Sequence, residues 1–200
     1  MTEPGTSRYR ETYESWKRDP QAFWSGAASL IDWIEPPHSV FDASAGTYGR
    51  WFGGAVCNTC WNAVDRHVET RGDQTAVVYD SPVTGAKRKI TYRELRDDVA
   101  TLAAVLLEHG VAKGDRVLVY MPMVPEAVVA MLACARIGAV HSVVFGGFAA
   151  KELATRIDDA RPRMILTASC GIEPSRVVAY KPLLDEAIDL SAHKPSAVLL

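Results

Sequence analysis

The sequence contains no apolar run of the roughly 18 residues that a membrane-spanning helix requires. Residues 1–20 lack the apolar core of a secretory signal, and their acidic side chains are atypical of a transit peptide. The 22 basic and 24 acidic residues give a net charge of −2, so charge does not favour nucleic acid or an anionic membrane as a partner. We therefore expect a cytoplasmic protein whose partners are small molecules, with no nucleic acid and no membrane among them.

Several motifs of nucleotide and hydrolase chemistry are also missing. The chain has no G-x-x-x-x-G-K-S/T phosphate loop, no G-x-S-x-G elbow and no G-x-G-x-x-G dinucleotide fingerprint. Four cysteines without a secretory context are expected to be thiols. Cys57 and Cys60 form a C-x-x-C without the second pair that a zinc ribbon needs, so we expect packing thiols and no metal.

What the chain does contain is an α/β pattern, clearest between Asp115 and Phe148. Residues 116–120 and 140–145 are short apolar runs typical of buried parallel strands. The segment between them opens with Pro125 and is followed by Gly138, which suits a crossover helix that is apolar on nearly every side. Gly146 and Gly147 then fall at the carboxyl end of a strand, where open α/β sheets bind ligands.

The same periodicity predicts the elements on either side of this stretch. We expect strands at 75–80, 88–91, 164–167 and 197–200, and helices from about 58 to 68, 92 to 106, 149 to 160 and 182 to 190. Thr91 and Glu94 form a predicted capping box. Residues 169–180 are predicted to form a loop, and His141 is predicted to lie in the core. Asp65, Arg66 and His67 resemble a catalytic relay, but adjacent helical residues do not face one another, so we expect an ion pair there instead.

Residues 1–61 differ from the rest because all five tryptophans lie there. Helical spacing near Tyr13 and Phe23, with a small polar stretch after the Pro36-Pro37 pair, predicts two short helices and a long loop without a sheet of its own. The predicted fold class is thus α/β. A helical, aromatic-rich arm over residues 1–61 is followed over residues 62–200 by an incomplete, mostly parallel sheet with helices.

Several motifs resemble those of one family. They are Y-x-x-x-Y-x-S from Tyr9, the Asp19-Pro20 and Phe23-Trp24 pairs with Trp33, WFGG at 51–54, Asn58, NAVDRH at 62–67, and YMPMVPEAVVAMLACARIGAVHSVVFGGF at 120–148. The chain is similar to the amino-terminal part of the AMP-forming acyl-CoA synthetases, in the acetyl-CoA and propionyl-CoA synthetase branch. YDSPVTG at 79–85 and GIEPSR at 171–176 look closer to propionyl-CoA synthetases. The resemblance implies that residues 62–200 begin an adenylate-forming large domain.

The resemblance also implies a CoA site. A turn that contacts the nucleotide end of CoA matches Glu173, Pro174, Ser175 and Arg176 in this sequence, and the glycine beside the CoA path matches Gly147. The acetate branch often has arginine at both ends of the turn. Glu173 stands at one end here, which leaves Arg176 as the only cation expected to meet phosphate.

The resemblance implies CoA, ATP and Mg²⁺ for the complete enzyme, and a small carboxylate and the remainder of the ligase as partners. The family's phosphate loop, magnesium segment, acyl pocket and adenylation lysine match nothing in residues 1–200, so no catalytic residue is assigned. The alternatives that stay open are a non-enzymatic α/β module that binds CoA, and an interaction piece that docks through its aromatic arm.

Residues 1–200 by themselves are expected not to form an acyl-CoA, because the phosphate loop and the lysine that the resemblance implies are missing. The measurement is propionate- or acetate-dependent pyrophosphate exchange into ATP with the purified chain. Exchange above the background without enzyme would contradict the expectation.

Overall fold

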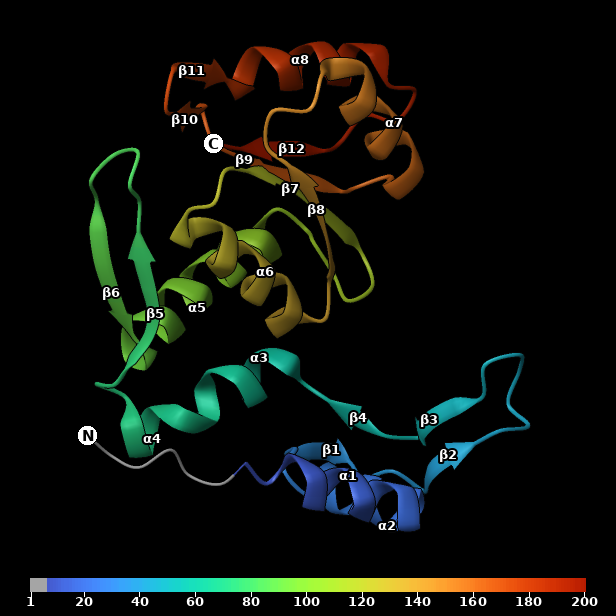
Figure 1. The fold of residues 1–200 in the computed structure, drawn as a ribbon. Helices are drawn as coiled ribbons and strands as arrows, with labels where there is room; N and C mark the ends of the chain where they lie inside the picture. The colour runs from blue at the N-terminus through green and yellow to red at the C-terminus, as the bar shows by residue number, and fades with distance from the viewer. Residues whose placement is uncertain (1–6) are drawn as a thin grey trace. The chain divides into compact units, whose positions relative to one another are not determined.

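The computed structural model describes residues 7–200, so the first six residues of the predicted arm lie outside the described part. The chain divides into two compact units, Met1–Asn58 and Thr59–Leu200. Figure 1 shows the helices and strands of each unit.

The smaller unit holds the two predicted helices and also short strands. The helices are α1 (Tyr9–Arg18) and α2 (Pro20–Ala28). The strands are β1 (Trp33–Glu35), β2 (Ser39–Asp42), β3 (Arg50–Gly53) and β4 (Val56–Cys57), paired antiparallel as β1 with β4 and β2 with β3. The prediction of a loop without a sheet was therefore wrong. The pairing is stabilised by contacts across the sequence that periodicity does not reveal.

Aromatic packing explains why these strands form. The ring of Trp51 lies 4.7 Å from that of Phe41 and 5.5 Å from that of Trp24, measured between centroids. Phe41 and Trp51 are cross-strand partners of β2 and β3, so their contact stabilises the pairing directly. Asp19 accepts a hydrogen bond of 3.0 Å from the backbone N–H of Ala22 and thereby caps α2.

The larger unit is built on a four-stranded parallel sheet of order β12-β9-β7-β8. Its strands are β7 (Arg116–Met121), β8 (Val140–Phe145), β9 (Met164–Thr167) and β12 (Ala197–Leu199). A separate antiparallel hairpin precedes them, formed by β5 (Thr75–Asp80) and β6 (Lys87–Thr91). These strands confirm the predicted α/β class and the parallel pairing.

Helices cover both faces of the parallel sheet (Figure 1). They are α5 (Tyr92–Glu108), α6 (Pro125–Ile137), α7 (Ala150–Ala160) and α8 (Tyr180–Leu190). The Thr91 side chain accepts from the Glu94 N–H, and the Glu94 carboxylate accepts from the Thr91 N–H at 2.8 Å, which confirms the capping box. Gly138 ends α6 in the left-handed conformation, with a φ of 76°.

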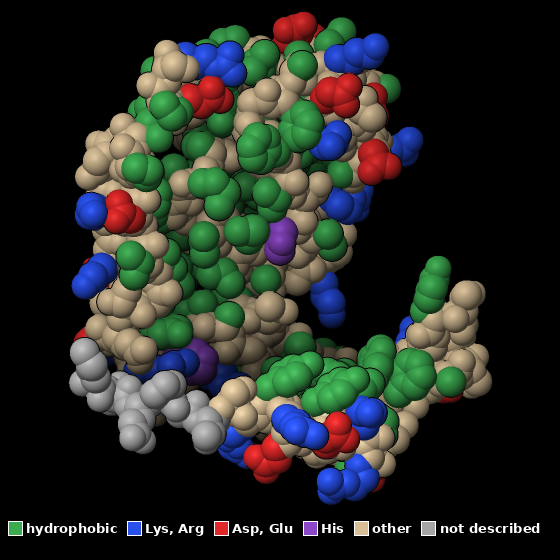
Figure 2. Space-filling model, viewed as in Figure 1, with side chains coloured by type: hydrophobic (Ala, Val, Ile, Leu, Met, Phe, Trp, Pro, Cys, Tyr) green, Lys and Arg blue, Asp and Glu red, His purple; other side chains and the backbone are tan. Residues whose placement is uncertain are grey.

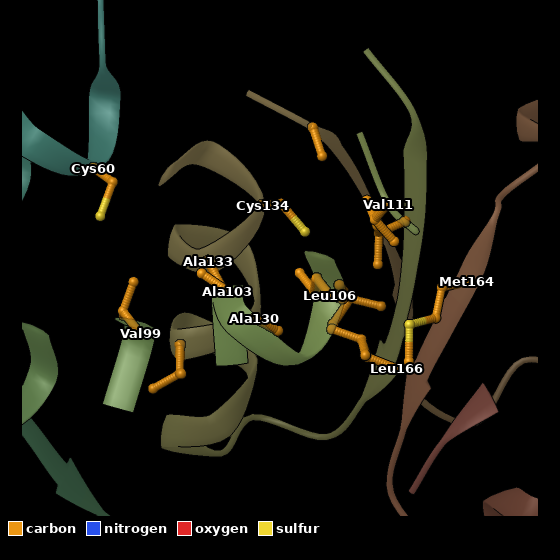
Figure 3. Close-up of a cluster of buried hydrophobic side chains, with 14 of the residues drawn as sticks. Cys60, Val99, Ala103, Leu106, Val111, Ala130, Ala133, Cys134, Met164 and Leu166 are labelled. Carbon is orange, nitrogen blue, oxygen red and sulfur yellow. The ribbon is translucent and has the colours of Figure 1, made fainter. Parts of the chain in front are cut away.

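Alternate side chains of the central strands enter two different cores. Val117 and Val119 of β7 pack with α5 and α6. Met164 and Leu166 of β9 lie in the same core (Figure 3). Leu118, from the opposite face of β7, packs with α7 and α8. Each fully buried side chain of this size contributes about 1.5–3 kcal/mol before the entropy cost. The continuous apolar run of β7 is therefore explained by burial on both faces.

The strand β8 departs from the prediction. It was predicted to be buried, yet Val143 and Phe145 are 53% and 75% exposed, and His141 is exposed rather than in the core. β8 is a terminal strand of the sheet, and Val144 is its one fully buried residue. Figure 2 shows hydrophobic side chains gathered over α6 and β8 on the viewed face. No helix in residues 7–200 is both long and apolar enough to cross a membrane.

The helix predicted from about residue 58 is broken into short pieces. These are α3 (Thr59–Ala63), a 3₁₀ turn over Asp65–His67, and α4 (Val68–Arg71). Cys60, Val64 and Val68 are buried, whereas Ala63 is exposed. Asp65 finds its ion-pair partner in Arg136 of α6, with an N–O distance of 2.8 Å, and not within the Asp65–His67 segment.

Replacing Arg136 with leucine should destabilise the protein because it leaves the carboxylate of Asp65, whose side chain is 10% exposed, without its cation. We expect a loss of about 2–3 kcal/mol in the free energy of unfolding, below the 3–5 kcal/mol of a fully buried pair because Arg136 is partly exposed. Denaturant unfolding measures it. Arg96→Leu, which breaks the exposed pair with Asp97, is the control and should cost less than about 1 kcal/mol. Equal losses in the two variants would contradict the prediction.

Candidate functional site

The carboxyl ends of the parallel strands meet at one edge of the sheet, and two hollows lie along it. The chain leaves β7 for α6 on one face, whereas it leaves the neighbouring β9 for α8 on the other face. This reversal is the position at which open α/β sheets commonly bind ligands. A hollow of about 720 Å³ lies there, lined by residues of the loops after both strands, among them Pro122 and Ser169. Sequence reasoning missed it, because the strand order was not predictable.

A second hollow, of about 500 Å³, adjoins the first through shared lining residues such as Met121 and Cys170. Its walls come from the β5–β6 turn, the end of β8 with Gly146, and the segment after β9 with Glu173 and Tyr180. Of the five residues predicted to bind CoA, only Glu173 lines this hollow.

The predicted loop over 169–180 is instead a β-hairpin. Its strands are β10 (Cys170–Glu173) and β11 (Arg176–Ala179), in register from Cys170 opposite Ala179 to Glu173 opposite Arg176. Pro174 and Ser175 form the exposed turn between them. The proline is compatible with a tight turn, but the pairing of Gly171 with Val178 could not be read from the alternation of residues. The hairpin therefore places Glu173 directly opposite Arg176, with Pro174 and Ser175 between them.

Glu173 and Arg176 form an ion pair at the base of this turn. Nε of Arg176 donates a hydrogen bond of 2.8 Å to a carboxylate oxygen of Glu173. This bond and the charge of Glu173 raise the pKa of Arg176 above its usual value. Among the described residues, the two terminal nitrogens of Arg176 have no partner, and the side chain is 69% exposed. The turn therefore offers unpaired donors on a guanidinium whose charge Glu173 largely balances.

Gly147 lies in the loop that follows β8 and is exposed, with a φ of 96°. A Cβ added at this position would meet no atom within 4 Å, so a side chain here would not clash with the rest of the protein. The positive φ alone favours glycine here.

Two tyrosines that sequence reasoning missed connect these parts. Tyr120 and Tyr180 are both buried, with ring centroids 4.9 Å apart. The Tyr120 hydroxyl donates to the backbone oxygen of Phe148 at 3.2 Å. Burial raises the pKa of Tyr180, and the nearby charges of Tyr120 and Glu173 add to the shift. The signal in the sequence was Gly171, because a glycine inside a strand often marks a close approach.

The cysteines lie in different environments. Cys60 and Cys134 are buried and Cys170 is half-buried, whereas Cys57 is exposed, so the prediction of a packing thiol was wrong for Cys57. Burial first, and then the charge of Asp65, raises the pKa of Cys60 to about 11, and burial raises that of Cys134 to about 11. Within residues 7–200, no group of three or more His, Cys, Asp or Glu side chains is placed to hold a metal ion.

Comparison with known proteins identifies the class. Residues 64–199 match the protein family described as "AMP-binding enzyme", and residues 9–63 match "Acetyl-coenzyme A synthetase N-terminus". The chain belongs to the AMP-binding enzyme family, as the sequence motifs predicted.

The relatives include proteins named as an acyl-CoA synthetase and as a propionate–CoA ligase. The chain is 50% identical over 197 residues to the mitochondrial acyl-CoA synthetase short-chain family member 3 of Bos taurus, covering 98% of this chain and 29% of that protein. It is 47% identical over 192 residues to the propionate–CoA ligase of Salmonella typhimurium, covering 96% and 31%.

A solved structure agrees with the fold. Acetoacetyl-CoA synthetase from Streptomyces lividans superimposes with a TM-score of 0.84 at 27% identity, over 97% of this chain and 30% of that one. The chain thus spans about 30% of the length of the relatives that it matches.

Alkylation should distinguish the cysteines. With iodoacetamide near pH 8, Cys57 should react first, because Cys60 and Cys134 are buried and, with a pKa of about 11, hold a thiolate fraction of roughly 0.1%. Peptide mass spectrometry measures the labelling, and the same reaction in denaturant is the control, in which all four cysteines should react. Labelling of Cys60 as fast as Cys57 in the folded protein would show that the segment around α3 is open.

Proposed function

We propose that this chain is the amino-terminal part of an AMP-forming short-chain acyl-CoA synthetase, which converts propionate or acetate, ATP and CoA to acyl-CoA, AMP and pyrophosphate. The observation that carries the proposal is the pair of adjoining family matches, over residues 9–63 and 64–199, which follow the order of the arm and the large domain in such enzymes. The names of the relatives support the ligase over a non-enzymatic module.

The proposed reaction has two steps. A carboxylate oxygen of the acid attacks the α-phosphorus of ATP and pyrophosphate leaves, giving an acyl-adenylate. The thiolate sulfur of CoA then attacks the acyl carbon and AMP leaves. Because this chain spans about 30% of the length of its relatives, we assign the ATP, Mg²⁺ and acyl sites to parts of the enzyme outside residues 1–200.

Within this chain, we propose that CoA contacts Gly147 and the turn from Glu173 to Arg176. The terminal nitrogens of Arg176 have the planar donor geometry that phosphate oxygens accept. The Glu173 carboxylate repels a phosphate and keeps Nε occupied. CoA therefore binds this turn more weakly than it would bind a turn whose arginine had no acidic partner.

The complete reading frame that contains this chain tests the activity. Purified protein is assayed for pyrophosphate exchange and for thioester formation with a series of short carboxylates. Propionate- or acetate-dependent AMP release that requires CoA supports the proposal. Absence of both half-reactions with every acid, in a folded protein, would refute it.

Two substitutions test the turn in that protein. Arg176→Ala should raise the KM for CoA by roughly tenfold, the low end for a lost charged hydrogen bond because the side chain is exposed. Glu173→Gln should lower it by a few-fold, since it removes the repulsion and leaves Arg176 unbalanced. Pyrophosphate exchange, which does not involve CoA, should stay nearly unchanged in both.

The matched control is Lys181→Ala, which removes another exposed cation, one that pairs with Asp185 on α8. Its KM for CoA should equal that of the parent protein. If Arg176→Ala lowered both half-reactions equally, or if Lys181→Ala raised the KM as much, the assignment of Arg176 to CoA would be wrong.

A further inference from the structure

Tyr180, the first residue of α8, lies between two chain segments that contain glycine. Its side chain belongs to the core between the sheet and helices α7 and α8, and the residue is only 5% exposed. A Cβ built on Gly146, after β8, would lie 2.2 Å from the Tyr180 hydroxyl oxygen, and one built on Gly171, in β10, would lie 2.4 Å from it. Real Cβ contacts are not that short, so the tyrosine occupies the place where both side chains would be.

Neither glycine is required by its backbone conformation. Gly146 and Gly171 have no positive φ, unlike Gly147 at 96°. An L-residue could adopt either φ, and the three atoms nearest to each added Cβ all belong to Tyr180. Gly146 at the end of β8 and Gly171 in the hairpin therefore leave the space that the Tyr180 side chain fills.

The contacts continue to the residues of the proposed CoA site. Gly146 adjoins Gly147 in the chain, and the hydroxyl of Tyr120, whose ring packs on that of Tyr180, donates to the backbone oxygen of Phe148. On the other side, Gly171 lies two residues before Glu173 in the same strand. The Tyr180 side chain thus lies against both the loop after β8 and the β10–β11 hairpin.

We propose that Tyr180 is a positioning residue that fixes the glycine loop over residues 146–148 relative to the β10–β11 hairpin. Tyr180 would then hold Gly147 and Arg176 at a fixed distance from each other, so that both can contact CoA. This consequence for catalysis rests on the proposed function. The hydroxyl of Tyr180 makes no hydrogen bond to another of residues 7–200, so its contacts with the protein are packing contacts. Tyr180→Phe should therefore keep the positions of the loop and the hairpin. Tyr180→Leu should not, because leucine is smaller and not planar.

A double-mutant cycle tests the contact without assuming any activity. Gly146→Ala should lower Tm by about 4–8 °C, as overpacking does, and should have much less effect when Tyr180→Leu is also present. The control is Gly26→Ala in α2, where an added Cβ meets nothing within 4 Å. Its effect should be the same with either residue at 180. Additivity of Gly146→Ala with Tyr180→Leu would overturn the proposal.

If Tyr180→Leu does not fold, Tyr180→Phe serves in the cycle. It removes the hydroxyl oxygen at 2.2 Å and leaves the ring carbon at 2.8 Å, so it should relieve part of the cost of Gly146→Ala. An unchanged cost would overturn the proposal in the same way.

Hydrogen exchange and kinetics on the complete protein then separate positioning from simple stability. Tyr180→Leu should speed amide exchange in residues 146–148 and 170–179 together, and should raise the KM for CoA several-fold while pyrophosphate exchange stays nearly constant. Tyr180→Phe should restore both. Faster exchange in one segment only would overturn the proposal. Coupled exchange in a protein that carries out neither half-reaction would leave Tyr180 as a positioning residue and refute the proposed function instead.

Discussion

The parallel pairing of β7 with both β8 and β9 is the constraint on which the larger unit depends. It directs Val117 and Val119 into the core with α5 and α6, and Leu118 and Tyr120 into the core with α7 and α8. A shift of one residue would exchange the two sets and place the Tyr120 ring among the wrong helices. The register of β7 therefore fixes the helical layers and also the position of the tyrosine pair beneath the candidate site.

The carboxyl edge of the sheet is shaped by a contrast between small and large residues. Gly146 and Gly171 leave room, and Tyr180 fills it. The exposed ion pair of Glu173 with Arg176 sits at the tip of the adjoining hairpin, where it contributes little to stability. Packing thus fixes the base of the hairpin, while the charges at its tip remain available to solvent and to a ligand.

Elements whose signal is local were predicted well. The strand at Thr75–Asp80, the strand at Val140–Phe145 and the capping box at Thr91 agree with the structure, because alternation, turn residues and capping are properties of neighbouring residues. The broken helix after Asn58 and the β10–β11 hairpin were predicted wrongly. In the first case the ion pair of Asp65 joins residues 71 positions apart, and no local pattern indicates such a partner.

The sequence by itself determined the α/β class, the crossover from β7 to β8 and membership of the AMP-binding enzyme family, since these follow from short-range periodicity and from long motifs. The candidate turn from Glu173 to Arg176 could also be named from the sequence. Only the tertiary structure decided that Glu173 balances Arg176, that β8 is an exposed terminal strand, and that Tyr180 stands between two glycines. Each of these depends on distances between residues on different elements, which strand order and side-chain packing set.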